Sequence, residues 1–335
     1  MARQRLPQVT VITTGGTIAC RIDPATGAAI PVVSGDELVA LLPGVERIAR
    51  LTVRELSLIP SWSFTPTFMH AIARNVTTEL ERGSDGVVIT QGTDTLEESA
   101  YWLDLTVDLA RYHRPVVVTG AMRNNSEVGA DGPRNLLDAI TVAAAPKAIY
   151  PTPVVVANSQ LHAARHVVKT DSFSPATFQS PGHGPAGHIV DGRVILTRHD
   201  VARRPVLVVD DSSSQVPLIK WAAGMDDLLL RACLDARVDG VVIEGSGLGH
   251  VHADALPVIG ALIEQSIPVV MTTRCQTGPV LAQYGGAGGG KSLAALGVIR
   301  AGHLPGPKAR LLLIAALGAG VPFQELASLF ERERR

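Results

Sequence analysis

Residues 87–100 of the chain read VVITQGTDTLEESA, and this stretch decides how the surrounding sequence can fold. It begins with Val87, Val88 and Ile89, a run of β-branched apolar residues that is typical of a strand covered on both faces. Gly92 then allows a sharp change of direction because it carries no Cβ. The stretch therefore predicts a buried strand that ends in a tight polar turn.

A helix is expected to begin directly after this turn. Thr95 and Glu98 have the spacing of a capping box, which predicts a helix over residues 95–111. Apolar residues recur in it at helical spacing and would form the face that turns towards the core. That face comprises Leu96, Ala100, Leu103, Val107 and Ala110. A strand, a turn and a helix in this order predict one unit of an α/β fold.

The turn presents polar side chains at the carboxyl end of a strand, which is where open parallel sheets bind ligands. Thr93 and Asp94 stand at this position, and the N–H groups at the start of the helix favour an ionised Asp94. Two interpretations follow from the turn alone. Asp94 either takes part in binding or catalysis, or together with Thr95 it only caps the helix, as such residues usually do.

Composition and length narrow the class of protein. A chain of 335 residues corresponds to about two domains. Aromatic residues make up only 4% of a sequence that is 46% apolar, so the core must be mainly aliphatic, as in parallel-sheet proteins. The 30 basic and 31 acidic residues give no electrostatic footprint for nucleic acid or for an anionic membrane. Without a secretory signal or an apolar run of membrane-spanning length, we expect a cytoplasmic protein.

A second polar turn follows the first predicted strand, residues 8–12. Residues 13–19 read TTGGTIA, in which two glycines precede Thr17 in an arrangement similar to the turn around Thr93. Residues 21–34 contain two prolines and a glycine and show no helical or strand periodicity, which predicts a long loop next to Thr17. Long loops of this kind often act as lids. A plain strand-ending turn remains the alternative interpretation of the glycine pair.

Strands and helices alternate along most of the chain, which makes a parallel sheet the default in both halves. The other expected elements are helices 35–42, 66–82 and 133–144, strands 51–59, 115–118, 154–156, 205–209 and 216–219, helix 226–236, strand 239–244, helix 253–265, strand 268–272, and helices near 308–318 and 322–333. We predict a two-domain α/β protein. A larger N-terminal domain with a parallel or mixed sheet spans residues 1–205, a linker spans 206–224, and a smaller domain with a parallel sheet spans 225–335.

Two further patterns resemble cofactor or metal sites, but both are weak. Residues 245–249 read GSGLG, like part of a dinucleotide-binding fingerprint. His250 stands where a small residue is expected and no acidic residue follows a second strand, so a simple turn is the better interpretation. His162 and His166 are four residues apart within the Ser-, Pro- and Gly-rich stretch 159–191. No carboxylate or cysteine accompanies them, so we interpret them as polar loop residues and expect no metal and no cofactor.

Three stretches become specific when they are taken together. TTGGTIA at 13–19, TQGTDTLEE at 90–98 and RHVVKT at 165–170, in this order and at these strand ends, resemble the bacterial-type L-asparaginase family of threonine amidohydrolases. The sequences GAMR at 120–123 and ADGPRN at 130–135 are similar to that family as well. The resemblance runs from about residue 8 to the C-terminus and implies an asparaginase-like fold of two domains.

The residues suit this chemistry. A threonine hydroxyl is a poor nucleophile until a base removes its proton, and a lysine serves as that base only where burial favours its neutral form. The resemblance implies that Thr17 is the nucleophile and that Thr93, Asp94 and Lys169 form a supporting triad. It implies that L-asparagine acylates the threonine and releases ammonia, and that water then frees L-aspartate. Backbone N–H groups at the glycine turns are suitable donors to an oxyanion.

The resemblance also implies a binding site for a small amide substrate. Ser61 would bind the α-carboxylate and Asp94 the α-amino group, and Trp62, Gly92 and Thr93 complete the predicted substrate-binding residues. The family further implies a homodimer or homotetramer in which each active site is bordered by a neighbouring subunit. We therefore expect partners to be the substrate and further copies of this chain, with no nucleic acid and no membrane.

The chain departs from the family pattern around the substrate. Residues 18–35 contain no tyrosine, although the lid of the family usually carries one, and Ala29 is the best-matching position. Trp62 and Ser63 stand where the family usually has glutamine and aspartate. The glycine-rich segment 283–291 contains no carboxylate, whereas many members place a glutamate there that reaches a neighbouring subunit.

Four functions remain open. The retained catalytic residues favour hydrolysis of L-asparagine, with the proton of Thr17 taken by Lys169, Tyr284 or a water. Trp62 adds apolar bulk and the missing carboxylate weakens binding of an ammonium, so an amide without a free α-amino group is the alternative substrate. A non-catalytic small-molecule sensor on the same scaffold is the third, because fold does not determine function. A fourth interpretation, a nicotinamide-dependent enzyme, is supported only by the glycines of 245–249.

Overall fold

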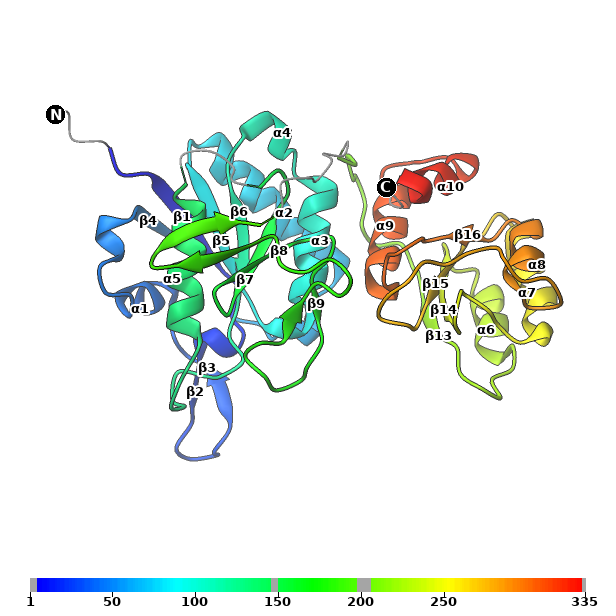
Figure 1. Ribbon diagram of the computed structural model, residues 1–335, viewed down its shortest axis with the longest axis horizontal. Helices are drawn as coiled ribbons and strands as arrows, with labels where there is room; N and C mark the ends of the chain where they lie inside the picture. The colour runs from blue at the N-terminus through cyan, green and yellow to red at the C-terminus, as the bar shows by residue number, and fades with distance from the viewer. Residues whose placement is uncertain (1–4, 146–149, 198–205, 333–335) are drawn as a thin grey trace. The chain divides into compact units, whose positions relative to one another are not determined.

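The computed structural model describes residues 5–145, 150–197 and 206–332, and the elements below belong to these ranges. The chain separates into two compact units, Met1–Val206 and Leu207–Arg335 (Figure 1). The predicted fold class is confirmed, because the larger unit contains a mixed sheet and the smaller unit a parallel one. In the described ranges no helix is long and apolar enough to cross a membrane.

An eight-stranded sheet forms the larger unit, in the order β12-β11-β8-β7-β6-β5-β1-β4. Its parallel part consists of β4 (Arg50–Glu55), β1 (Gln8–Thr13), β5 (Gly86–Thr90), β6 (Val116–Thr119) and β7 (Val154–Ala157). The antiparallel part consists of β8 (Gln160–Ala163), β11 (Gly187–Val190) and β12 (Arg193–Leu196). Every residue of β5 is buried, as its run of β-branched residues predicts.

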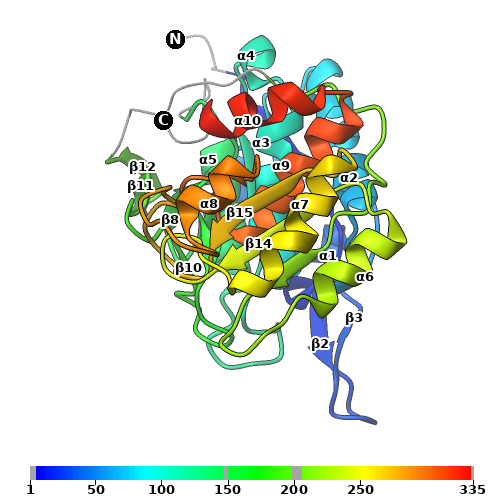
Figure 2. The same cartoon turned by 90° about the vertical axis from the view of Figure 1, so that its right-hand side faces the viewer.

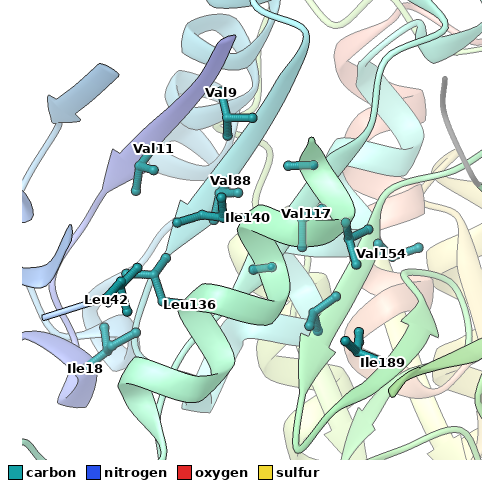
Figure 3. Packing of buried hydrophobic residues seen from close by; sticks show 14 of the residues in the cluster. Val9, Val11, Ile18, Leu42, Val88, Val117, Leu136, Ile140, Val154 and Ile189 are labelled. Carbon is teal, nitrogen blue, oxygen red and sulfur yellow. The ribbon is translucent and has the colours of Figure 1, made fainter. Parts of the chain in front are cut away.

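One face of this sheet is covered by α5 (Gly132–Ala143), joined by α1 (Gly35–Ala40). Leu136 and Ile140 of α5 belong to one apolar cluster with Val88 of β5 and Val117 of β6, and Ile140 lies beside Val88 (Figure 3). Each such apolar side chain contributes about 1.5–3 kcal/mol when it is fully removed from water. Successive strand residues face opposite ways, so Val87 and Ile89 of β5 face the other layer, where α2 (Pro66–Glu81) and α3 (Leu96–Thr106) contact the sheet.

The connections that leave β1 and β5 run over opposite faces of the sheet. After β1 the chain forms a hairpin of β2 (Cys20–Ile22) and β3 (Ala29–Pro31) and enters α1, on the α5 face. After β5 it enters α3, which packs with α2 on the other face. Adjacent parallel strands whose connections diverge in this way leave a crevice at their carboxyl ends, where α/β sheets bind ligands. The fold therefore points to the turns 14–17 and 91–94.

The smaller unit contains a parallel sheet in the order β13-β14-β15-β16 (Figure 1). The strands are β13 (Leu218–Lys220), β14 (Val241–Gly245), β15 (Val269–Thr273) and β16 (Ile299–Arg300). Its helices are α6 (Leu228–Ala236), α7 (Leu256–Glu264), α8 (Gly290–Ala295), α9 (Gly306–Gly318) and α10 (Phe323–Arg332). Neither α8 nor β16 is predicted from the sequence, because elements of six and two residues are too short to establish a periodic pattern.

The single helix predicted over 95–111 is wrong, since two helices occupy this region. α3 ends before Val107, which has extended backbone angles, and α4 (Leu109–Tyr112) begins after Asp108. The Asp108 carboxylate accepts a hydrogen bond from the Arg111 N–H at 3.1 Å and so caps a new helix, a signal that the apolar spacing hides. Ala110 is consequently exposed rather than turned towards the core.

Two segments predicted as loops contain strands. The segment 21–34 contributes to the β2–β3 hairpin, which extends from the larger unit in both views (Figures 1 and 2). The stretch 159–191 supplies β8, β9 (Val168–Lys169), β10 (Phe178–Gln179) and β11. Strands of two to four residues carry too little alternation to be recognised among prolines and glycines.

Two predicted strands also differ from the structure. β4 ends at Glu55 rather than at residue 59. Residues 206–209 form no strand, and residue 205 lies outside the described residues. A strand requires a neighbouring backbone to pair with, and the short apolar run at 206–209 pairs with none of the described strands.

Candidate active site

The turns after β1 and β5 contact each other backbone to backbone. The N–H and Oγ1 of Thr14 donate to the carbonyl oxygen of Thr90 at 3.0 and 2.9 Å. Gly16 has φ +84° and ψ −179°, a conformation that is essentially restricted to glycine. A Cβ at Gly16 would lie 2.1 Å from the backbone nitrogen of Gly92. Position 16 therefore requires glycine for two reasons, and this contact sets how near Thr17 comes to the β5 turn.

Thr17 opens a 3-10 turn, Thr17–Ala19, directly after that contact, and its side chain is half-buried. The N–H of Ala19 donates to the carbonyl oxygen of Gly16 at 2.9 Å. The Cys20 thiol donates to the same oxygen at 3.3 Å, and burial raises the pKa of this thiol, which keeps it protonated as a donor. These bonds hold the backbone on both sides of Thr17.

Lys169 joins the two polar side chains of the β5 turn. Its Nζ donates to Thr93 Oγ1 at 2.9 Å and to Asp94 Oδ1 at 2.6 Å. Thr93 is 6% exposed and the Lys169 side chain 15% exposed, whereas the Asp94 side chain is 49% exposed. An ion pair with one partner half in water adds at most about 1 kcal/mol of stability. Its main effect is therefore to hold the Lys169 ammonium group in place beside Thr93 and Asp94. Three of the predicted catalytic residues thus meet at one ammonium group.

Glu97 holds the backbone of Lys169 and is absent from the predicted site residues. One of its carboxylate oxygens accepts a hydrogen bond from the Lys169 N–H, and Glu97 is only 8% exposed. In the sequence, Glu97 is one of two glutamates in the first turn of a helix, where the helix dipole favours acidic residues in general. That signal does not separate a residue of the site from one that merely stabilises the helix end.

Ser61 ties the loop before α2 to the β5 turn. It is 1% exposed, its Oγ accepts a hydrogen bond from the Asp94 N–H at 3.2 Å, and its carbonyl oxygen accepts one from Thr95 Oγ1 at 2.9 Å. The predicted capping box is therefore wrong, because the Thr95 hydroxyl is directed to Ser61 and makes no cap bond. A Cβ at Gly92 would lie 2.6 Å from Ser61 Oγ, so glycine leaves room for the serine.

The residues at which the chain departs from the family pattern are exposed. Trp62 follows Ser61 in the 3-10 turn Ser61–Ser63, and 75% of its surface is accessible. Ala29 lies exposed at the start of β3. Tyr284 belongs to the smaller unit, is 57% exposed, and contacts His250 edge to face with ring centroids 5.4 Å apart.

The polar-loop interpretation is wrong for His162, which is buried in β8. Its Nδ1 lies 2.9 Å from Ser180 Oγ and its Nε2 lies 3.1 Å from Gln160 Oε1. Burial, with a smaller contribution from a nearby histidine, lowers the pKa of His162 to about 4. His166 instead stacks on His183, with ring centroids 3.8 Å apart. Within the described ranges no three histidine, cysteine, aspartate or glutamate residues are grouped so that they could hold a metal ion.

The GSGLG sequence forms a tight turn. The N–H of Ser246 donates to the carbonyl oxygen of His250 at 2.9 Å and closes an antiparallel bridge. A Cβ at Gly249 would lie 2.7 Å from a methyl group of Val280, so this glycine serves packing. No helix begins at these glycines, in contrast to a dinucleotide-binding turn.

Comparison with known proteins covers nearly the whole chain. The family model for the N-terminal asparaginase domain matches residues 8–202, and that for the glutaminase/asparaginase C-terminal domain matches residues 215–330. A probable L-asparaginase from Deinococcus radiodurans is 36% identical over 328 residues, which cover 97% of each chain. A glutamyl-tRNA(Gln) amidotransferase subunit from Halobacterium salinarum is 32% identical over 335 residues, covering 95% of this chain and 77% of that protein.

A solved structure is similar as well. The probable cytoplasmic L-asparaginase from Campylobacter jejuni superposes with a TM-score of 0.86 at 29% sequence identity, covering 97% of this chain and 99% of that one. Both family domains occur in their expected order, and the stretches 13–19, 90–98 and 165–170 lie at the two turns and around β9. The chain therefore belongs to the asparaginase family of amidohydrolases.

Proposed function

We propose that this protein hydrolyses the side-chain amide of L-asparagine to L-aspartate and ammonia through an acyl-enzyme on Thr17. The main observation behind the proposal is that Lys169 Nζ contacts both Thr93 and Asp94. These two residues lie in the turn after β5, which contacts the turn before Thr17 at Gly16 and Gly92. Family membership and the relatives described as L-asparaginases support the class of substrate.

The proposed reaction begins with attack of Thr17 Oγ1 on the amide carbon, which forms a C–O bond and places negative charge on the carbonyl oxygen. Backbone N–H groups of the glycine turns suit this developing charge. Collapse breaks the C–N bond, and the nitrogen leaves as ammonia after it gains a proton. Water then adds to the threonine ester, and its collapse returns the Thr17 hydroxyl and releases the carboxylic acid.

Lys169 and Thr93 form the proton route in this proposal. Because Thr93 Oγ1 accepts a hydrogen bond from Lys169 Nζ, its own hydroxyl proton can be given to the departing nitrogen. Transfer of the Thr17 proton to Lys169 requires the neutral amine. Water is the other acceptor of that proton that we consider.

Asp94 and Ser61 form the proposed recognition site. The Asp94 carboxylate is half exposed and already binds one ammonium group, that of Lys169, so it can accept a second from a free amino acid. The Ser61 hydroxyl accepts a bond from the Asp94 N–H and retains its own proton to donate to a carboxylate. Together the two side chains would hold the two charged groups of an α-amino acid.

A different small amide is the second candidate substrate, and the surroundings of Ser61 favour it. The exposed Trp62 ring follows Ser61 directly and adds apolar surface beside it. An amide whose α-amino group is absent or masked would suit this surface. A sensor without catalysis is the third candidate, and an acyl adduct on Thr17 detected by mass spectrometry would exclude it.

The test is ammonia release from L-asparagine, D-asparagine, L-glutamine, succinamic acid and N-acylated asparagine, measured side by side with a Thr17→Ala control. We expect L-asparagine to react fastest and the control to be inactive. Faster ammonia release from succinamic acid or a masked amide would instead favour the second candidate, an amide without a free α-amino group. Absence of ammonia with every amide would contradict amide hydrolysis and favour the sensor.

We also propose a cytoplasmic homodimer or homotetramer with shared active sites, in keeping with the family and with the description of the Campylobacter jejuni protein. Light scattering coupled to size exclusion measures the assembly, and cell fractionation measures the location. A monomer that retains full activity would contradict shared sites.

A further inference from the structure

We infer that Asn125 is a positioning residue for Thr17, because it fastens the segment that carries the proposed nucleophile to the loop after β6. The inference rests on the role proposed above for Thr17. Asn125 lies in the polar loop between β6 and α5, more than a hundred positions from Thr17 in the sequence.

Two hydrogen bonds from Asn125 reach the backbone just beyond Thr17. Its side-chain Nδ2 donates to the carbonyl oxygen of Ile18 at 2.6 Å. Its backbone N–H donates to the carbonyl oxygen of Cys20 at 3.1 Å. The next residue, Ser126, accepts a bond from the Ile22 N–H at 3.1 Å through its Oγ. The loop thus binds the segment 18–22 at alternate residues.

Ile18 is therefore held from two directions. Its side chain is 1% exposed and lies near Leu136 of α5 in the apolar cluster (Figure 3). Its carbonyl oxygen is held by Asn125. Since the carbonyl group of Ile18 and the Oγ1 of Thr17 belong to consecutive residues of a three-residue 3-10 turn, a rotation of that turn moves both. The Asn125 bond restricts this rotation.

The loop that supplies Asn125 is itself fixed. The N–H of Arg123 donates to the carboxylate of Asp131 at 2.8 Å, next to the start of α5. The Asn124 side chain donates to Glu127 Oε1 at 2.5 Å and accepts a bond from the Ser126 N–H at 2.9 Å. Because this loop is held by its own hydrogen bonds, the Asn125 donor can determine the position of the Thr17 turn. On an unrestrained loop, the donor would move together with that turn.

The plainer explanation is that Asn125 only stabilises the base of the β2–β3 hairpin. Ser126 distinguishes the two, because it belongs to the same loop and binds the same hairpin at Ile22, further along the chain from Thr17 than Ile18. A contribution to the hairpin alone would make both side chains matter equally. A positioning role predicts that only the Asn125 side chain affects Thr17.

The experiment compares Asn125→Asp and Asn125→Ala with the matched control Ser126→Ala in the full-length protein. Asn125→Asp keeps the side-chain shape and replaces the Nδ2 donor with a carboxylate oxygen that repels the Ile18 carbonyl. Hydrogen exchange by mass spectrometry reports opening of the peptide that contains 17–20, and steady-state ammonia release gives kcat and KM for L-asparagine.

We expect both Asn125 variants to exchange about tenfold faster at 17–20 and to lose roughly tenfold or more in kcat, with KM within about twofold of the wild type. Ser126→Ala should stay within about twofold of the wild type in exchange at 17–20 and in kcat. A β5 peptide spanning 86–90 serves as the internal standard and should not change.

Equal behaviour of the Asn125 variants and Ser126→Ala would overturn the inference. Faster exchange of the β5 peptide would overturn it as well, because the loss would then be one of general stability. Faster exchange at 17–20 with an unchanged kcat would equally reject a role in catalysis. If the wild type releases ammonia from no amide, the proposed function fails, and the exchange data alone decide whether Asn125 holds the Thr17 turn.

Discussion

Gly16 lies where the turns after β1 and β5 meet, and its replacement by alanine tests whether this contact places Thr17. Its backbone angles would cost an alanine about 1–3 kcal/mol by themselves. The added Cβ would also lie 2.1 Å from the nitrogen and 2.3 Å from the Cα of Gly92, whereas ordinary contacts begin at 3.4 Å. One of the two turns must therefore move by more than about 1 Å, and Thr17 follows Gly16 directly.

A displacement of about 1 Å at reacting groups lowers rates by roughly a hundredfold, equivalent to about 2.7 kcal/mol of barrier. We therefore expect Gly16→Ala to lower kcat at least about a hundredfold and to lower Tm by roughly 5 °C. Gly27→Ala is the matched control. Gly27 also has a positive φ, +69°, but nothing lies within 4 Å of a Cβ there. This control should lose about 1 kcal/mol of stability and keep its activity within about twofold.

Ammonia release and thermal unfolding of the two variants, measured in parallel, separate the two costs. Activity of Gly16→Ala above a tenth of the wild-type value would refute the reasoning, because the turns would then tolerate separation. Equal losses in both variants would show that the positive φ is responsible and that the contact between the turns is not.

Three further predictions concern Glu97 and Trp62 at the site and the buried His162 of β8. Glu97→Leu removes the acceptor of the Lys169 N–H and should lower kcat by roughly tenfold or more. Glu97→Gln keeps an acceptor and should retain most activity. Steady-state kinetics measure both variants, and equal losses would reject a role of Glu97 in holding the Lys169 backbone. Trp62→Gln should raise kcat/KM for L-asparagine, and no gain would count against Trp62 as a determinant of specificity. Because burial lowers the pKa of His162 from 6.5 to about 4, the unfolded chain binds its proton more tightly than the folded protein does. The stability that neutral His162 contributes is therefore complete above about pH 6.5 and declines as the pH falls towards 4, by about 2 kcal/mol at pH 5. Urea unfolding at about pH 6.5 and pH 5 measures this loss of stability. A His162→Gln variant that retains the full pH dependence would contradict its assignment to His162.

The central strands and their turns are predictable because their signals are local. A run of β-branched residues such as Val87 to Ile89 predicts a buried strand whatever lies beside it, and a glycine followed by threonine predicts a polar turn. Parallel strands then bring the turns of β1 and β5 to the same edge. Lys169 is different, because 75 positions separate it from Asp94 and only the family resemblance indicates that the two meet.

The residues that are not predicted from the sequence act through backbone groups. Glu97 accepts from a backbone N–H and Asn125 donates to a backbone carbonyl, so neither partner has a side chain whose type would reveal the pair. Thr95 shows the reverse error. It resembles a helix cap in the sequence but is not one, because its hydroxyl is used by a segment 34 residues earlier. Asp108 is a cap that the predicted single helix passes over.

The site thus has an inner part that is fixed by buried contacts and an outer part that is exposed. Gly16, Glu97 and Asn125 act on the backbones that carry Thr17 and Lys169, and a change at any of them should affect the rate with every amide. Trp62 and Ala29 lie exposed and make no comparable contacts among the described residues. Substitution at these outer positions should therefore leave the position of Thr17, the proposed nucleophile, unchanged. This separation would explain how the proposed catalytic residues are kept while residues beside the proposed recognition site depart from the family pattern.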